Sequence, residues 1–368
     1  MRRLSIQNFC IGQFALVMSL FLPMLFVWSV PESCGQESSR PFLLQIKQQA
    51  SELKIAFAAN NESSKSLPRY SPLAISFLDA ADTLAPIEPR KIYVRKNPRS
   101  YLSPEQFRQL SLTERESYSE QFCDERLYYG HYSTPLAWTR PFDRLGQQGF
   151  NSLEGKKVLD FGFGNVGQLR MLASLGASVT GIEISDSIPS AMYYLHSDQG
   201  TVGKISDDIE SNGELKLVFG KWPADQDIID DVGVGFDLFI SKNVLKYGYI
   251  HPEREAPGSQ LIDLGVNDEE FLISLFDALN PGGFVLIYNI HPPKSKADER
   301  YKPWAYGETP WDKDLVKKVG FKVIEWHVDD SQAIHDFGRV IDWNKSFPSE
   351  EAYQANFRAM YTILRKPK

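Results

Sequence analysis

The chain has 368 residues, a length that predicts a domain of about 250 residues with an N-terminal extension. Hydrophobic residues make up 42% and charged residues 24%, which excludes a wholly disordered chain because enough apolar side chains are present to fill a core. The formal net charge of -7 argues against a nucleic-acid partner, since proteins that grip a phosphate backbone usually carry a basic face.

The histidines and cysteines do not form a metal-binding pattern. The six His and three Cys include no Cys-x-x-Cys pair and no two His at the ligand spacing of one helix. We therefore predict no metal site and expect His131, His196 and His327 to be packed or solvated.

The first 35 residues have the pattern of an export signal. Arg2 and Arg3 precede an apolar run over residues 11–30, and Ser33 and Gly35 supply small residues at positions −3 and −1 of a cleavage site. This pattern predicts a signal peptide cleaved after Gly35. An uncleaved membrane anchor competes with it, because roughly 20 apolar residues span a bilayer. Both interpretations place the body outside the cytoplasm, periplasmic or extracellular, with the membrane as a partner only through an uncleaved segment.

Two other export signals fit less well. A lipoprotein at Cys34 would need small or aliphatic residues where Pro31 and Glu32 stand, and a twin-arginine signal would need an apolar residue in place of Ser5. After cleavage only Cys123 would remain, so no intrachain disulfide is expected.

Residues 36–115 are predicted to form a mainly helical extension without chemistry of its own. The apolar periodicity favours helices over residues 43–59 and 73–84, and residues 91–95 favour an extended segment. Ser103 and Pro104 have the pattern of a helix start, with Ser103 as the cap. The remaining residues, 116–368, are predicted to form the second domain.

The second domain begins with a helical pattern over residues 113–129 and a turn rich in aromatic and hydroxyl groups over residues 128–135. A further helix is expected through Trp138 and Phe142, which we interpret as core residues. Tyr132 and Arg140 are the better candidates for reaching a ligand.

A strand, a glycine-rich turn and a helix follow. The strand runs from Lys156, the turn contains Gly162 and Gly164, and the helix begins near Gly167. Glycine permits backbone conformations and close ligand approach that a side chain would forbid, and the helix N-terminus offers free N–H groups. Glu183 stands near the end of the next strand, where a carboxylate can accept both ribose hydroxyls of an adenosine.

The glycine spacing alone fits two kinds of cofactor. Gly162, Gly164 and Gly167 also satisfy the fingerprint of NAD enzymes, with an acidic residue about 20 positions further on. Asp160 separates the two, because a carboxylate repels a pyrophosphate but attracts the sulfonium and amino groups of S-adenosylmethionine (SAM). The pattern therefore favours SAM. Because SAM is made in the cytoplasm, a SAM site conflicts with the export predicted above, and this conflict stays open.

The segment 158–164, Val-Leu-Asp-Phe-Gly-Phe-Gly, resembles the first motif of the class I SAM-dependent methyltransferases. Val166 stands where many members have a third glycine. The resemblance continues with expected strands over residues 215–219 and 236–241 and with a Pro-Gly-Gly turn at Pro281 that leads into a fifth strand. Residues 320–324 and 360–364 supply the sixth and seventh strands, with no crossover helix evident between them.

This resemblance implies an α/β fold: a Rossmann-like, seven-stranded, mostly parallel sheet whose last strand is antiparallel. It implies SAM as cofactor and a small-molecule, or else protein, acceptor. Lys221 departs from the acidic residue that often faces the adenine, and Trp222 can instead stack on the base or belong to the core. The candidate cofactor residues are Asp160, Gly162, Gly164, Gly167, Glu183, Ile184, Lys221, Trp222 and Ser241.

The acceptor is expected beyond the carboxyl ends of the strands, where ligands bind in open α/β sheets. The loop after the fourth strand offers Asn243, Tyr247 and His251 as candidate catalytic residues, with His251 as a natural general base. The alternative is an aromatic loop that packs on the extension. Residues 329–355 are a second candidate for covering the acceptor.

Three functions remain open from the sequence. The first is transfer of a methyl group from SAM, which needs little from the protein beyond alignment. The second is an exported binding module that kept the fold without catalysis. The third is an NAD(P)-dependent oxidoreductase, which depends only on the glycine spacing.

Overall fold

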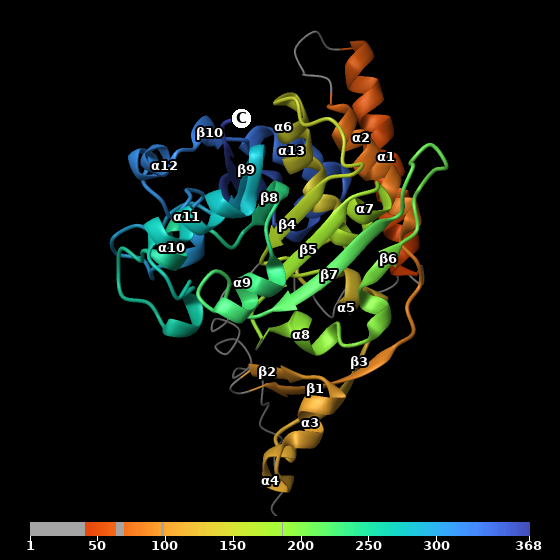
Figure 1. Ribbon diagram of the computed structural model, residues 1–368, viewed down its shortest axis with the longest axis vertical. Helices are drawn as coiled ribbons and strands as arrows, with labels where there is room; N and C mark the ends of the chain where they lie inside the picture. The colour runs from red at the N-terminus through yellow and green to blue at the C-terminus, as the bar shows by residue number, and fades with distance from the viewer. Residues whose placement is uncertain (1–40, 64–69, 97–98, 186) are drawn as a thin grey trace, which may run out of the picture.

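The computed structural model describes residues 41–63, 70–96, 99–185 and 187–368 (Figure 1). The predicted signal peptide or anchor, with its cleavage site, lies outside the described residues. Across the described ranges no helix has both the length and the apolar character that a membrane crossing requires.

The core of the molecule is an eight-stranded sheet with the strand order β10-β11-β9-β8-β4-β5-β7-β6. Strands β9, β8, β4, β5 and β7 run parallel, whereas β11 is antiparallel to both of its neighbours and β6 is antiparallel to β7. The strands are β4 (Lys157–Phe161), β5 (Ser178–Glu183), β6 (Gly200–Val202), β7 (Gly213–Phe219), β8 (Phe236–Lys242), β9 (Leu279–His291), β10 (Lys322–Asp329) and β11 (Arg358–Arg365).

The predicted fold class is confirmed. The seven expected strands form the sheet, and the last of them, β11, is antiparallel to β9 and β10. Two details differ from the prediction. The short edge strand β6 was not predicted, and β10 and β11 are separated by the helices α13 (Ser331–Val340) and α14 (Glu350–Asn356). The connection between them is thus helical.

Alternate residues of the central strands face two separate helical layers, as the period of two in a strand requires. Val158, Leu238 and Ile240 belong to the core cluster that contains α7 (Gly167–Ser174) and α6 (Thr139–Gln147). Leu159 and Phe239 belong to the cluster on the other face, which contains α11 (Asp268–Ala278) and α12 (Lys313–Val319). Figure 1 shows α10, α11 and α12 on one side of the sheet and α1, α2, α6 and α13 on the other.

Short helices complete the layers. They are η2 (Pro135–Trp138), α8 (Ile188–Met192), η3 (His196–Asp198), α9 (Gln226–Val232), α10 (Tyr247–Ile250), η4 (Gly258–Gln260), η5 (Pro303–Ala305) and η6 (Trp343–Ser346).

The N-terminal helices pack directly on the sheet's helical layer. They are α1 (Phe42–Ser63), α2 (Pro72–Asp79) and η1 (Ala80–Thr83), and their buried faces join the same core cluster as α6 and α7. Gln49 Nε2 donates to the carbonyl of Ile341 at 3.2 Å, and the Ser71 N–H donates to Asp143 Oδ1 at 2.7 Å. The extension is therefore joined to the body by side-chain hydrogen bonds as well as by apolar contact.

A second sheet corrects the helix that was predicted over residues 113–129. That segment contains only the short helices α4 (Leu112–Arg115) and α5 (Glu125–Gly130), and between them lies β3 (Ser119–Cys123). This strand pairs antiparallel with β1 (Arg90–Lys96), which also pairs with β2 (Arg99–Leu102). The sheet crosses the predicted boundary at residue 115. With α3 (Pro104–Gln109), which Ser103 caps as predicted, it lies at one end of the molecule (Figure 1).

Arg140 was expected to reach a ligand, and the structure corrects this. Its guanidinium is buried and donates two hydrogen bonds of 2.7 Å to Asp330, with a third of 2.5 Å to Asp143. The hydroxyl of Tyr288 also donates to Asp330, at 2.8 Å. This buried ion cluster joins α6 to the carboxyl end of β10. Because its guanidinium donates to carboxylates of the chain itself, Arg140 has a structural role.

Candidate cofactor site at the carboxyl edge of the sheet

The glycine turn after β4 has the backbone that only glycine adopts readily. Gly162 has φ of 73° and Gly164 has φ of 62°, both in the left-handed region. The Gly162 N–H donates to the carbonyl of Ile182 at 2.9 Å, which fixes the turn against β5. A Cβ at Gly162 would collide with Val244, and one at Gly164 would lie 3.0 Å from the Tyr132 ring. Both side chains therefore lie against the turn.

Gly167 has a different role from the two turn glycines. It is the first residue of α7, and a Cβ there would lie 3.0 Å from the side chain of Pro135 and 3.3 Å from that of Tyr129. Its lack of a side chain allows η2 to approach the start of α7. The structure thus places Gly167 in a helix contact beside the turn.

Asp160 is a fully buried carboxylate one residue before the end of β4. Gln168 Nε2 donates to its Oδ2 at 3.2 Å, whereas within the described residues Oδ1 has no hydrogen-bond partner. Burial raises the pKa of Asp160 to about 7, and the Gln168 hydrogen bond and the nearby charge of Lys242 oppose this rise. An uncompensated buried oxygen of this kind is costly unless a ligand meets it.

Glu183 and Ile184 end the neighbouring strand β5. Glu183 Oε1 accepts a hydrogen bond of 3.0 Å from the Ile184 N–H, and burial raises the pKa of the Glu183 carboxyl to about 7 against hydrogen bonds from Ile184 and Gly164. The Ile184 side chain is 53% exposed. An apolar side chain in contact with water thus lies next to a carboxylate, an arrangement that suits a nucleoside.

Lys221 and Trp222 follow β7 and point to different surroundings. The Lys221 ammonium is exposed and pairs with Asp263 at 3.1 Å. Trp222 is only 3% exposed and lies in the core, with its ring centroid 5.4 Å from that of Phe271 and 6.1 Å from that of Phe161. The structure thus corrects the stacking role considered for Trp222, because its ring is packed among core aromatics.

The end of β8 contains one predicted residue and one that sequence reasoning missed. Ser241 is buried and donates its hydroxyl to the Phe161 carbonyl at 3.0 Å, which holds β8 to the end of β4. Lys242 follows as the last residue of the strand, with its ammonium 5.8 Å from the Trp138 ring centroid. Burial lowers the pKa of Lys242 to about 8, and the charge of Asp160 opposes this shift. A lysine that ends a mostly apolar parallel strand was the available signal.

The three candidate catalytic residues lie in the loop after β8 but do not converge on one point. Asn243 has φ of 67° and accepts a hydrogen bond of 2.7 Å from the Ile290 N–H, so its side chain fastens the loop to β9. Tyr247 and His251 are neighbours, with ring centroids 5.5 Å apart. His251 Nε2 lies 2.9 and 3.0 Å from the two carboxylate oxygens of Asp268. Their catalytic role stays a prediction.

Lys246, which follows β8, and His291, the last residue of β9, are two further buried groups. The Lys246 ammonium donates to the carbonyls of Ile290 and Trp304 at 2.5 and 3.1 Å. Burial lowers the pKa of Lys246 to about 7, aided by the charge of Lys242, and lowers the pKa of His291 to about 4. The charge of Lys242 thus disfavours the protonated form of Lys246, whereas the charge of Glu308 favours the protonated form of His291.

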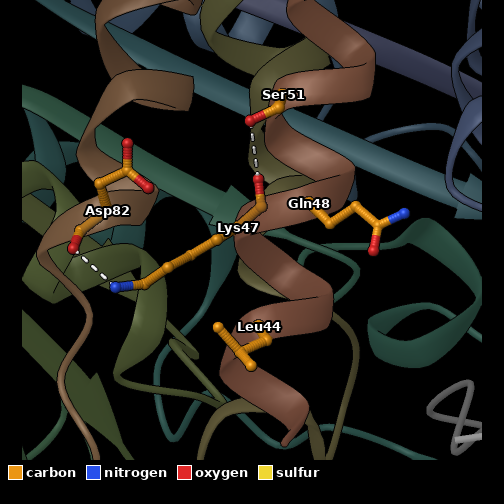
Figure 2. A pocket seen from close by; sticks show the side chains of 5 residues that line it. All are labelled: Leu44, Lys47, Gln48, Ser51 and Asp82. Carbon is orange, nitrogen blue, oxygen red and sulfur yellow. Dashed lines mark hydrogen bonds between the residues drawn. The ribbon is translucent and has the colours of Figure 1, made fainter. Parts of the chain in front are cut away.

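Two hollows lie apart from the glycine turn. One of about 430 Å³ surrounds His251, Asp263 and Asp268 at the start of α11. The other, of about 420 Å³, lies between α1 and η1, where Lys47 donates to the carbonyl of Asp82 (Figure 2). Leu44, Gln48 and Ser51 complete its lining. Over the described ranges, no three His, Cys, Asp or Glu residues gather as metal ligands.

Comparison with protein-family models and with curated proteins finds no match. Among solved structures, phosphoethanolamine N-methyltransferase 2 of Haemonchus contortus with phosphomonomethylethanolamine and S-adenosylhomocysteine is 16% identical, and the match covers 64% of this chain and 54% of that one at a TM-score of 0.36. The chain thus spans about half the length of that protein. The same enzyme with S-adenosyl-L-methionine is 13% identical over 80% of this chain and 74% of that one, with a TM-score of 0.38.

An arsenic(III) S-adenosylmethionine methyltransferase of Chlamydomonas reinhardtii is 18% identical, with 59% of this chain and 65% of that one covered at a TM-score of 0.30. At these identities and TM-scores the likenesses carry no argument about activity, and the fold assignment depends on the strand order. That order gives the chain the Rossmann-like fold that its sequence resemblance to the class I SAM-dependent methyltransferases implies.

Proposed function

We propose that this chain binds SAM at the carboxyl edge of its sheet and transfers the methyl group to a small-molecule acceptor. The observation that carries the proposal is Asp160, a fully buried carboxylate with an unpartnered oxygen beside a glycine turn. A pyrophosphate cofactor would be repelled at this point, whereas an ammonium group would supply the missing hydrogen bond. This favours SAM over the NAD(P) alternative.

The residues at the edge of the sheet fit the rest of the cofactor. Glu183 ends β5, one strand away from Asp160, where its carboxylate can accept the two ribose hydroxyls. Ile184 beside it is exposed and can cover one face of the adenine. The two turn glycines leave the backbone between these groups open to close approach. The donor set therefore matches an amino acid joined to a nucleoside.

When bound, SAM supplies a methyl group that its sulfonium has already activated. The chain's own residues then have to bind the acceptor, exclude water and hold it in line with the carbon that is transferred. Tyr247 and His251 lie at the start and just past the end of α10, which follows β8, and the Asp268 carboxylate accepts from His251 Nε2. His251 is the group there that can act as a general base toward an acceptor.

Isothermal titration of the purified chain with S-adenosylhomocysteine, the demethylated product, tests the proposal. We expect one site per chain, with Asp160→Ala and Glu183→Ala each weakening binding by about one to two decades, because each removes a charge-assisted contact. Asp314→Ala is the matched control, since that carboxylate is exposed on α12 and pairs with Lys317. A folded protein that does not bind the product would contradict the proposal.

A further inference from the structure

Lys242 is placed so that its side chain and that of Asp160 share one face of the sheet. The strand register pairs Asp160 of β4 with Ile240 of β8. Side chains alternate along a strand, so Lys242 lies on that same face two residues nearer the carboxyl edge. The position that matches it, just beyond the end of β4, is Gly162, and the Val244 side chain fills the space that a side chain at residue 162 would occupy.

The Lys242 ammonium differs from its basic neighbours in the hydrogen bonds and ion pairs that it makes. Lys246 donates to two carbonyls, and Arg140 is enclosed by Asp143 and Asp330. For Lys242, the described part of the chain records no hydrogen bond or ion pair, only the Trp138 ring at 5.8 Å. Burial lowers the Lys242 pKa and the charge of Asp160 opposes this shift, although no ion pair joins the two side chains among the described residues.

The two groups have opposite charge, and the charge of each favours the charged form of the other. Asp160 offers an unpartnered carboxylate oxygen and Lys242 offers an ammonium, on adjacent strands beside the same glycine turn. An α-amino acid carries the complementary pair, an ammonium and a carboxylate on one carbon. A lone lysine beside a sulfonium would instead repel it. The carboxylate of the amino-acid end removes that conflict.

Resting on the function proposed above, we propose that Lys242 binds the α-carboxylate of the cofactor's amino-acid end while Asp160 binds its α-ammonium. Lys242 is then a cofactor-binding residue and not the base that deprotonates the acceptor. The pair selects ligands that carry both charges, so it distinguishes the intact cofactor product from fragments that lack one or both.

Three ligands separate these contacts by calorimetry. S-adenosylhomocysteine carries both charged groups, S-adenosyl-3-thiopropylamine keeps the ammonium but lacks the carboxylate, and 5′-methylthioadenosine lacks both. We expect Lys242→Met to weaken S-adenosylhomocysteine binding about tenfold to a hundredfold, and to leave the other two ligands within about twofold, because only the first has a carboxylate to lose. Lys242→Arg is expected to restore most of the affinity.

Two variants serve as controls. Asp160→Asn is expected to weaken both ligands that contain the ammonium and to spare 5′-methylthioadenosine. Lys221→Met removes an exposed lysine that pairs with Asp263 and is expected to change none of the three affinities in the manner of Lys242→Met. Thermal unfolding followed by circular dichroism confirms that each variant is folded at the titration temperature.

The outcomes separate this inference from the proposed function. If the wild-type chain binds none of the three ligands, the proposed function fails and the role of Lys242 fails with it. If the wild type binds S-adenosylhomocysteine but Lys242→Met binds it equally well, or loses all three ligands to the same extent, the role of Lys242 is overturned while the proposed function stands.

Discussion

At the scale of single residues, the candidate site contains ionisable groups whose charged forms are destabilised by burial. Burial moves the pKa of Asp160 and of Glu183 up to about 7 and that of Lys242 down to about 8. Each shift means that the charged form is less stable in the folded chain than in water. Groups with this property are concentrated in binding and catalytic sites, because a bound ligand can supply the opposite charge or the hydrogen bond that stabilises the charged form.

Asp160→Asn is expected to stabilise the folded chain at pH 7.5. The folded pKa of about 7 exceeds the ordinary value of 3.8, so the wild type loses stability as pH rises from about 4 to about 7. The variant does not titrate and should be more stable by about 2–4 kcal/mol at pH 7.5, with the difference vanishing near pH 4. Urea unfolding at both pH values measures it. A variant that is less stable than the wild type at pH 7.5 would contradict the assigned shift.

How much of the site could be predicted depends on whether its signal is local. The turn glycines, Asp160 and Glu183 lie within one short segment whose pattern is characteristic, and the structure places them at one edge of the sheet. Arg140 could not be assigned from sequence, because its partner Asp330 is 190 residues away. Lys242 was missed for a similar reason, since its relation to Asp160 depends on the pairing of β4 with β8.

At the scale of elements, the turn between β4 and α7 and the loop after β8 depend on each other. Val244 packs where a Cβ at Gly162 would be, so the loop closes onto the turn only because residue 162 is glycine. The prediction of strands succeeded where apolar runs are strong and failed at β3, where only Cys123 is buried. That strand has no alternating pattern to detect, and it forms through pairing with β1.

Gly162→Ala is expected to weaken S-adenosylhomocysteine binding and to destabilise the chain by more than Gly149→Ala does. Both glycines have positive φ, 73° and 90°, so both substitutions strain the backbone by about 1 kcal/mol. Only the first adds a collision, because nothing lies within 4 Å of a Cβ at Gly149. Urea unfolding and calorimetry of the two variants measure the difference. If the two variants changed stability and affinity equally, the claim that the turn and the loop depend on each other would be contradicted.

At the scale of the whole molecule, buried ion clusters join the extension and the small sheet to the body. Arg140, Asp143 and Asp330 connect α6 with the end of β10, and Asp143 also accepts from the Ser71 N–H at the start of α2. Arg90 of β1 donates to both carboxylate oxygens of Asp198 at 2.7 Å. These two clusters therefore hold α2, α6 and β1 in defined positions against the body of the molecule.

Asp330→Ala is expected to destabilise the chain by about 3–5 kcal/mol, because it leaves the buried Arg140 guanidinium without its main partner. Asp336→Ala is the matched control: its pair with Arg339 is partly exposed to solvent and should contribute less than about 1 kcal/mol. Urea unfolding of both variants at pH 7 gives the comparison. A loss for Asp330→Ala as small as that for Asp336→Ala would show that the cluster does not join the parts.

The most direct test of the central claim is a crystal structure of the chain with S-adenosylhomocysteine. The account predicts the nucleoside at Glu183 and Ile184, the chain of the ligand across Gly162 and Gly164, and its ammonium within hydrogen-bond distance of the Asp160 oxygen that has no partner among the described residues. Crystals grown with saturating ligand that show it elsewhere on the molecule, or not at all, would contradict the account.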